Sequence, residues 1–340
     1  MTETVRVGFV GAGLIARSHA HGLAAAPGAS VVAVHDIDRE RAVSFATDHA
    51  GTADAAVGSL EAVVAACDAV YVCTWTSAHP AAVSAAAGAG RAVFCEKPLA
   101  VDLATASAMT AEVAEAGVVN QVGLVLRRSP SFRWLHRRVN DPTSGPLMNI
   151  VFRDDQYLPT QGMYGSTWRD DPSRAGAGTL LEHSIHDLDL LRWLMGPIAS
   201  VIAVTGSVHG IDGIEDQASV VLTARSGAQA ALTSVWHEVL SRPSQRRVEV
   251  FCRDAVVTLA GDWWGPVSCD DGAAVVELGG EELGAAVDDD GLGTNPDAAF
   301  VEAVRGGRPA FPDFATALEA HRLADAAYRS AADGGRPIAP

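Results

Sequence analysis

The chain has 340 residues, of which 48% are hydrophobic and 19% are charged, and its formal net charge is −16. This length suits two globular domains, and the acidic balance argues against nucleic-acid binding, which needs clustered Lys and Arg. Five scattered cysteines without a Cys-x-x-Cys pair predict neither a disulfide framework nor a zinc ribbon. The N-terminus lacks a secretory signal pattern and no run reaches about 18 apolar residues, so we expect a cytoplasmic protein without a membrane span.

Strand-like and helical segments alternate over residues 1–125. The pattern predicts strands at 5–10, 31–35, 69–75, 92–95 and 118–126, and helices at 14–26, 38–50, 59–66, 79–87 and 102–116. Asp38 and Asp102 begin two of these helices, where an aspartate side chain can accept otherwise unpaired backbone N–H groups. Repeated alternation of this kind predicts an α/β domain of the Rossmann type, a doubly wound parallel sheet with helices on both faces.

Residues 126–340 follow a different pattern, which predicts a second domain of the α+β kind. Strands are predicted at 150–152, 201–208, 217–224, 228–236, 247–253 and 256–259, a loop at 288–296, and helices at 297–304 and 315–332. Several of the strands alternate apolar and polar residues. We therefore expect a large, mostly antiparallel open sheet with one face solvated or used at an interface.

A glycine-rich loop, Gly11-Ala12-Gly13-Leu14-Ile15-Ala16, follows the first strand and opens a helix. In a dinucleotide-binding loop one glycine permits the tight turn, the second lets the backbone approach a pyrophosphate, and a small third residue permits close helix–strand packing. The helix N-terminus would then supply N–H groups and partial positive charge to the phosphates. An ordinary strand–helix turn is the alternative interpretation.

Asp36 ends the second strand, twenty residues beyond Ala16. A carboxylate in this position can accept both ribose hydroxyls of a dinucleotide and would repel a 2′-phosphate, so NAD is favoured over NADP. Arg39 and Arg41 are close in sequence and could soften that preference, which keeps NADP possible. A solvated loop acid is the alternative for Asp36.

The motif Glu96-Lys97-Pro98 stands at the end of a buried strand. Ligands of open α/β sheets bind at strand ends, and a lysine there can donate or take a proton beside a nicotinamide. Pro98 holds Lys97 in an extended conformation. Thr74 and His79 follow a second strand, so we expect Thr74, His79, Glu96 and Lys97 near the cofactor, although His79 could simply start a helix.

With these motifs in order, the chain resembles the glucose–fructose oxidoreductase, inositol dehydrogenase and rhizopine-catabolism family (Gfo/Idh/MocA). Further matches are Leu126-Arg127-Arg128-Ser129-Pro130, Trp168-Arg169 followed by Gly176-Ala177-Gly178, the helix from Glu182 through His186 to Asp189, Glu215-Asp216, and the closing helix. The resemblance spans essentially the whole chain. Two departures are Glu182, where the family has aspartate, and Ala177, where the family has glycine.

The resemblance implies that Lys97 and His186 carry the acid–base work and that Glu182 positions a substrate hydroxyl or adjusts Lys97. Glu182 and His186 are four residues apart, so we expect them to share one face of a helix, while His183 points about 100° away. A metal pair or a solvated helix face are the alternatives. Asp189 could orient the His186 ring.

Four residues are expected to contact the substrate: Arg127, Trp168, Arg169 and His183. Packing or salt-bridge roles are the alternative for the first three. The glycines at 176 and 178 would let a substrate approach the backbone closely.

The sequence therefore predicts an NAD-dependent dehydrogenase acting on a secondary hydroxyl of a sugar, glycoside or cyclitol, with a polyol or sugar as its small-molecule partner and no metal. The alternatives are an NADP-linked reductase of an amino-sugar, sugar-nucleotide or non-sugar carbonyl, and a cofactor-binding sensor without turnover. By analogy with the family, the second domain would bind substrate and form a homodimer or homotetramer.

Overall fold

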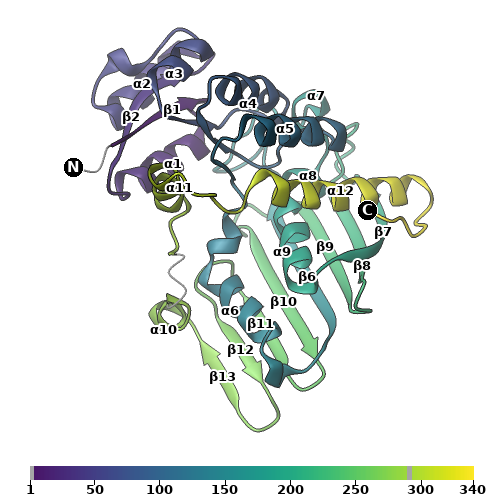
Figure 1. Ribbon diagram of the computed structural model, residues 1–340. Helices are drawn as coiled ribbons and strands as arrows, with labels where there is room; N and C mark the ends of the chain where they lie inside the picture. Colours follow the sequence, from purple (N-terminus) through teal and green to yellow (C-terminus); the bar gives the residue numbers. More distant parts are fainter. Residues whose placement is uncertain (1–3, 289–292) are drawn as a thin grey trace. The chain divides into compact units, whose positions relative to one another are not determined.

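The computed structural model describes residues 4–288 and 293–340, and the chain divides into two compact units (Figure 1). One unit comprises Met1–Leu124 and Asn295–Leu318, and the other Val125–Thr294 and Glu319–Pro340. The sequence predicts a single division between residues 125 and 126. Asn295–Leu318 is part of the predicted second domain, 126–340, but in the structure it belongs to the first unit, because Phe300 and Val301 pack in the apolar core of that unit. Residues 289–292 of the predicted loop lie outside the described residues.

The first unit is built on five parallel strands: β1 (Val5–Val10), β2 (Ala29–His35), β3 (Ala69–Val72), β4 (Ala92–Cys95) and β5 (Asn120–Val122). Their order in the sheet is β2-β1-β3-β4-β5, and a single parallel bridge between Val34 and Ala56 continues the sheet beyond β2. The strand order reverses between β1 and β3. The carboxyl ends of these two strands mark the crevice where such sheets bind ligands.

Helices cover both faces of this sheet, which confirms the doubly wound Rossmann arrangement. On one face pack α1 (Leu14–Ala24), α2 (Arg39–Ala50) and α11 (Pro296–Gly306), and on the other α3 (Leu60–Ala66), α4 (His79–Gly88) and α5 (Leu103–Ala116). Successive strand residues serve opposite cores, as Phe94 and Val93 do. Asp38 and Asp102 cap α2 and α5, as the sequence predicts.

The second unit contains one eight-stranded sheet in the order β13-β12-β11-β10-β6-β9-β8-β7. Its strands are β6 (Leu147–Tyr157), β7 (Ile198–Gly206), β8 (Gln217–Ala224), β9 (Gln229–His237), β10 (Gln245–Cys252), β11 (Val256–Ala260), β12 (Val267–Asp270) and β13 (Val275–Leu278). Only the β6–β9 pair is parallel among these, so the expected mostly antiparallel sheet is confirmed. The sequence pattern misses β12 and β13 and ends β6 five residues too early.

One face of this sheet is covered and the other is exposed within the chain. The core on the covered face takes residues from α6 (Pro130–Val139), α9 (Ile185–Met195) and α12 (Phe314–Ala332), and α7 (Pro172–Ala175), α8 (Thr179–Glu182) and α10 (Gly280–Ala285) complete the unit. Short 3₁₀ turns lie at Ala53–Ala55, Thr76–Ala78, Val125–Arg128 and Pro142–Ser144. Buried and exposed residues alternate strictly along the middle of β8, β9 and β10.

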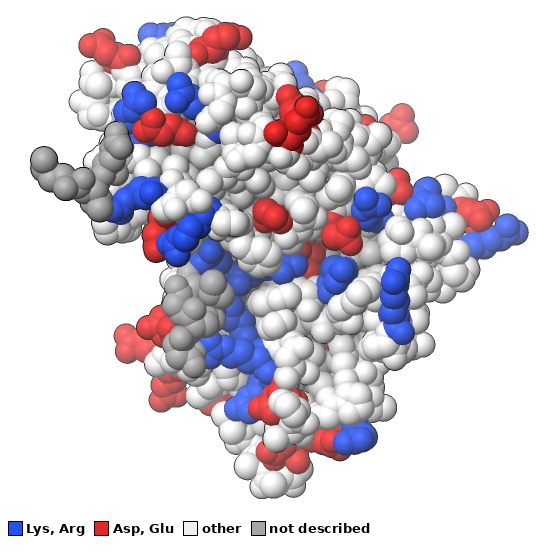
Figure 2. Space-filling view, viewed as in Figure 1, with Lys and Arg blue, Asp and Glu red and all other residues white. Residues whose placement is uncertain are grey.

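Charge is distributed without a dominant patch on the face of the first unit shown in Figure 2, where acidic and basic side chains are interspersed among uncharged ones. A nucleic-acid-binding surface has clustered Lys and Arg side chains, whereas this face mixes charges of both signs, in line with the acidic net charge of the chain. No helix within residues 4–288 and 293–340 is both long and apolar enough to cross a membrane.

Candidate active site

The glycine loop joins β1 to α1 and leaves its outer side open. Gly11 has φ of +93°, and a side chain there would run into the main chain of Cys73 and Thr74, so glycine is required. At Gly13, in contrast, no atom stands within 4 Å of the place a Cβ would take. Gly13 is also the N-cap of α1 and offers no side-chain cap. Uncapped N–H groups facing open space fit the pyrophosphate of a dinucleotide.

The first turn of α1 carries the remaining loop residues. Leu14 and Ile15 are exposed, whereas Ala16 is fully buried and allows the helix to lie close to the sheet. Two of the predicted cofactor residues are therefore accessible, and the third has the packing role that the sequence assigns to it.

Asp36 connects the end of β2 to the glycine loop. Its Oδ2 accepts the Ala12 N–H at 2.8 Å and its Oδ1 accepts the Asp38 N–H at 2.9 Å. Each carboxylate oxygen can accept a further bond, so the same group fits the hydroxyls of a ribose. Arg41 Nη1 lies 3.9 Å from Asp36 Oδ1, so one of the two arginines close in sequence also lies close to this carboxylate.

Glu96 turns its carboxylate into the interior of the first unit. Its Oε1 lies 2.9 Å from Nε2 of His19, and its Oε2 accepts the main-chain N–H of Lys97 at 3.2 Å. Burial opposes ionisation of Glu96, but His19 and Lys97 together lower its pKa. The Glu96 carboxylate therefore holds the turn itself, and the place of Glu96 near the cofactor stays a prediction.

His79 holds the ends of two neighbouring strands together. Its Nδ1 lies 3.0 Å from the carbonyl oxygen of Pro98 and 3.2 Å from that of Leu99, and its Nε2 lies 3.2 Å from that of Thr74. The ring is buried at the first residue of α4. His79 therefore joins the loop after β3 to the turn that carries Lys97, and Thr74 contributes its half-buried main chain to the same junction.

In the second unit, Glu182 and His186 do not belong to one continuous helix, and the prediction that they share a helix face is wrong. Glu182 ends α8 and His186 is the second residue of α9. The N–H groups of His183 and Ser184 both donate to the carbonyl of Thr179, at 3.1 and 2.9 Å, which widens the turn and restarts the helix.

The interruption is explained by contacts with β6. The Oγ of Ser184 donates to Asp154 at 2.7 Å, and Nε2 of His183 lies 3.0 Å from the same carboxylate. A regular helix would present these two side chains 100° apart, whereas the widened turn brings both to one acid. His183, predicted as a substrate contact, is thus anchored to the sheet.

Three predicted substrate-site residues do come together. The Nε of Arg169 donates to Oε2 of Glu182 at 3.2 Å, and the Arg169 guanidinium carbon lies 4.4 Å from the Trp168 ring centre. The Glu182 side chain is 1% exposed. The acid at the position where the family has aspartate is therefore held by an arginine that is itself stacked on tryptophan.

Arg127 is fixed inside the second unit. Its Nε and Nη2 each donate to one oxygen of Asp189 at 2.7 Å, and its guanidinium lies over the Trp193 ring at 5.1 Å. Both Asp189 oxygens accept from Arg127 in this way, and the suggestion that Asp189 also orients His186 stays a prediction. This geometry favours the salt-bridge interpretation of Arg127.

Gly178 permits a close approach between two parts of the chain, because the main chain of Glu215 lies against it. Oxygens of the Glu215 carboxylate accept the N–H groups of Gly178 at 2.7 Å and Leu180 at 2.9 Å, and a Cβ at Gly178 would overlap the Glu215 main chain. Glu215 thus caps α8 from a distant part of the sequence. The expectation that Gly178 opens the backbone to a substrate is wrong for this reason.

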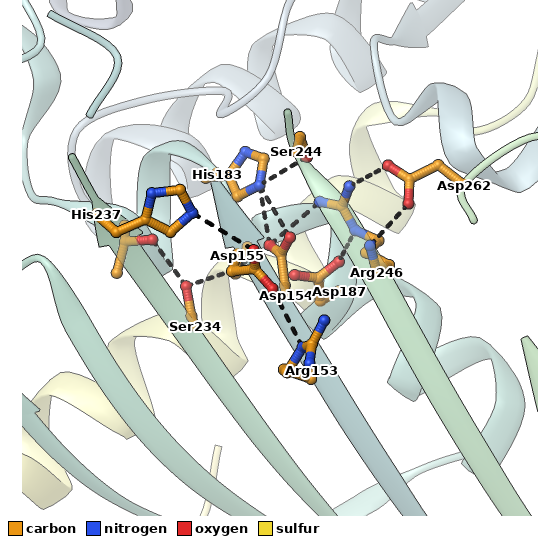
Figure 3. A network of polar contacts seen from close by, with 12 residues as sticks. Arg153, Asp154, Asp155, His183, Asp187, Ser234, His237, Ser244, Arg246 and Asp262 are labelled. Carbon is orange, nitrogen blue, oxygen red and sulfur yellow. Dashed lines mark hydrogen bonds and ion pairs between the residues drawn. The ribbon is translucent and has the colours of Figure 1, made fainter. Parts of the chain in front are cut away.

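A buried network of polar side chains, which the sequence analysis does not predict, includes His183 and its partner Asp154 (Figure 3). The Arg246 guanidinium donates to Asp154, Asp187 and Asp262. Burial works against ionisation of Asp154, but the charges of Arg246 and His183 hold its pKa well below the usual range. Burial and the charge on Asp154 raise the pKa of Asp187 well above its usual range. Of this pair, Asp187 is therefore the carboxyl that holds a proton more readily.

The sequence does carry a signal for this network. Acidic residues are disfavoured in strands, yet Asp154 and Asp155 begin two residues after the end of the predicted strand 150–152, so a strand extended through them would have placed two acids in the sheet. Among the residues that the structure describes, no group of three or more His, Cys, Asp and Glu side chains could hold a metal ion.

The fold and the glycine loop define a dinucleotide-binding Rossmann domain combined with an open-sheet domain. Residues 5–124 match the oxidoreductase family with NAD-binding Rossmann fold, and residues 132–258 match the GFO/IDH/MocA C-terminal domain. The chain belongs to the Gfo/Idh/MocA oxidoreductase family.

Two curated relatives are inositol 2-dehydrogenases. The protein of Cereibacter sphaeroides (strain ATCC 17029) is 34% identical over 66% of this chain and 65% of its own length, slightly less than two thirds. That of Rhizobium meliloti is 29% identical over 97% of this chain and 98% of its own. The WlbA dehydrogenase of Bordetella pertussis, solved with NADH and UDP-GlcNAcA, shares the fold at a TM-score of 0.85 and 23% identity, covering 99% and 98% of the two chains.

Proposed function

We propose that the protein is an NAD-dependent dehydrogenase that transfers a hydride between the nicotinamide and a secondary hydroxyl or ketone of a sugar, glycoside or cyclitol. The observation that carries this proposal is that Lys97 is the only lysine among the 25 Lys and Arg residues of the sequence. Arginine cannot release its proton at neutral pH, whereas lysine can when its surroundings lower its pKa. The single lysine of the sequence thus follows directly on strand β4 of the first unit, where it could exchange a proton with a bound substrate.

The chemistry divides between hydride and proton. The glycine loop and Asp36 would hold the dinucleotide, and its nicotinamide would supply the hydride acceptor for the oxidation of the alcohol to a ketone. The hydroxyl proton passes to neutral Lys97 or neutral His186, and the same group returns it in the reverse direction. Glu182, held by Arg169, orients a substrate hydroxyl.

NAD is proposed as the working cofactor in preference to NADP because of Asp36. A carboxylate at the end of the second strand would accept the ribose hydroxyls of NAD and repel the 2′-phosphate of NADP, and two backbone N–H groups hold the Asp36 carboxylate in place. Arg41, at 3.9 Å, reduces this repulsion only in part.

The substrate class rests on the two relatives named inositol 2-dehydrogenase. The test is to incubate the purified protein with NAD or NADP and a panel of inositols, hexoses and glycosides, and to follow the absorbance of the reduced nicotinamide. Keto-sugars with NADH test the opposite direction. We expect turnover of at least one polyol with NAD. No turnover of any compound in either direction would contradict the proposal.

We further propose that the second unit binds the substrate and associates through its exposed sheet face to form a homodimer or homotetramer. Ile202, Val221, Ala231 and Val151 are paired across four neighbouring strands, and Val221 and Val151 are more than 40% exposed. Such a row of apolar side chains is typical of an interface. Light scattering after size exclusion should give two or four chains, and Val221→Glu should lower the mass. A monomeric wild-type protein would contradict this assembly.

A further inference from the structure

A buried triad of ionisable side chains ties the Lys97 turn to the helix that follows the glycine loop. Nε2 of His19 lies 2.9 Å from Oε1 of Glu96, and its Nδ1 lies 2.7 Å from Oδ1 of Asp297. The three side chains are at most 9% exposed. His19 belongs to α1, Glu96 follows β4, and Asp297 lies in the first turn of α11, which packs beside α1 (Figure 1).

His19 is charged in this environment. Burial by itself lowers the pKa of His19, but the hydrogen bonds and charges of Asp297 and Glu96 outweigh burial and raise it to about 10. The imidazolium can then donate from both nitrogens, one to each carboxylate. The other titratable side chains facing the triad, Tyr71, Cys73 and Cys95, remain neutral because burial raises the pKa of each well above its usual value.

Residues packed against the triad restrict the positions that its three side chains can take. A methyl group on Gly123 would overlap the Glu96 carboxylate, and one on Gly22 would overlap that of Asp297. The His19 ring stands edge-on to Phe94 at 4.7 Å between centres. With Glu96 Oε1 fixed by His19, its Oε2 is left facing the main-chain N–H of Lys97 at 3.2 Å.

We propose that His19 is a positioning residue for Lys97. The doubly bonded imidazolium fixes the Glu96 carboxylate, and the carboxylate fixes the main chain of Lys97 relative to α1 and the glycine loop. The lysine is thereby placed against the cofactor-binding helix from within the first unit. The catalytic meaning of this placement rests on the proposed function, but the placement itself does not.

Because Lys97 is the only lysine, protein labelled with [15N]lysine has a single backbone amide signal from that residue type, and this signal reports the contact with Glu96. We compare the wild type with His19→Gln and with the control His21→Gln, a change of the same kind at an exposed position of the same helix. In His19→Gln the Lys97 amide should shift and exchange at least about tenfold faster, while amides of β1 and β3, followed in uniformly 15N-labelled protein, keep their rates. In His21→Gln it should stay within about twofold of wild type. An unchanged Lys97 signal in folded His19→Gln overturns the proposal.

If His19→Gln does not fold, the double variant H19Q/D297N removes a carboxylate together with the cation and carries the same expectation. Wild-type protein labelled with [15N]histidine offers a second check, since one ring should have both nitrogens protonated at about pH 8. Absence of such a ring overturns the proposal as well.

Kinetics separate positioning from a merely structural role. His19→Gln should lower kcat at least about tenfold and leave the NAD dissociation constant within about threefold, because Asp36 and the glycine loop are untouched. An equal loss of kcat and NAD affinity overturns the positioning role. If no substrate is turned over while the Lys97 signal depends on His19, the proposed function fails and the placement of Lys97 by His19 stands.

Discussion

Arg169 and Glu182 form an ion pair in which the carboxylate is almost fully buried and the guanidinium is partly exposed, at 1% and 27% of their side chains. The extra methylene of glutamate, compared with the aspartate that the family resemblance leads one to expect, gives the acid its reach toward Arg169. Because the Glu182 carboxylate is buried away from water, its ionised form requires a neighbouring cation.

Replacing Arg169 by Gln should therefore destabilise the protein by about 1–3 kcal/mol, since Glu182 loses its partner. It should also raise the KM of the polyol about tenfold without changing NAD affinity. Arg174→Gln is the matched control, because Arg174 and Asp171 form an exposed pair whose loss should matter by less than about 0.5 kcal/mol. Chemical denaturation and steady-state kinetics measure both. Equal stability of the two variants would show that Glu182 does not need Arg169.

The two loop glycines should respond differently to alanine. Gly13→Ala fits its backbone and meets open space, so the protein should fold normally, yet the methyl group should raise the NAD dissociation constant at least about tenfold. Gly11→Ala forces a positive φ and a clash with Cys73, and should cost about 2 kcal/mol or more of stability. Calorimetry of NAD binding and thermal unfolding distinguish the two effects. Normal NAD binding by Gly13→Ala would mean that the pyrophosphate does not lie over this loop.

Stability should depend on pH through His19. The pKa of His19 is raised from 6.5 to about 10 in the folded protein, so its contribution is fully present below pH 6.5 and is lost as the pH rises toward 10. The shift corresponds to at most about 5 kcal/mol. Melting temperatures should thus fall more steeply over this range in wild type and His21→Gln than in His19→Gln. Parallel curves for all three proteins would contradict a charged His19.

Asp154 and Asp187, two acids of the network that includes His183, should differ in how much stability the protein loses when each is replaced by asparagine. Burial and the charge on Asp154 raise the pKa of Asp187 well above its usual range, which favours a proton on Asp187 over one on Asp154, so Asp187→Asn should be the milder change and cost less than about 1 kcal/mol. Asp154→Asn removes the charge that balances Arg246 and His183, and should cost about 3 kcal/mol or more. Urea unfolding of the two variants tests this order, and the reverse order would mean that the proton resides on Asp154.

Local patterns predict most of the first unit. The bounds of β1 and β4 agree with the sequence pattern, and Asp38 and Asp102 cap their helices, because strand burial and N-caps depend on residues close in sequence. The sequence pattern fails where contacts between residues far apart in the sequence determine the local structure. The widened turn at His183 exists because Asp154, about thirty residues earlier in the chain, binds it.

The same limit applies to the candidate site. The glycine loop, Asp36 and Lys97 can be found from spacing alone. The partners of the predicted residues cannot, because His19 reaches Glu96 and Asp297 only through the packing of α1 against α11. Asn295–Leu318 likewise looks like part of the second domain until its burial against the first is seen.

The proposed function depends on Lys97 in the acid–base step, whether the substrate's proton goes to Lys97 itself or to His186. Lys97→Arg tests it most directly, because arginine keeps the positive charge but cannot release a proton at neutral pH. With the polyol that the wild type oxidises, we predict that Lys97→Arg lowers kcat by about 10² to 10⁴ and leaves the NAD dissociation constant within about threefold. Turnover within about tenfold of wild type would contradict the account.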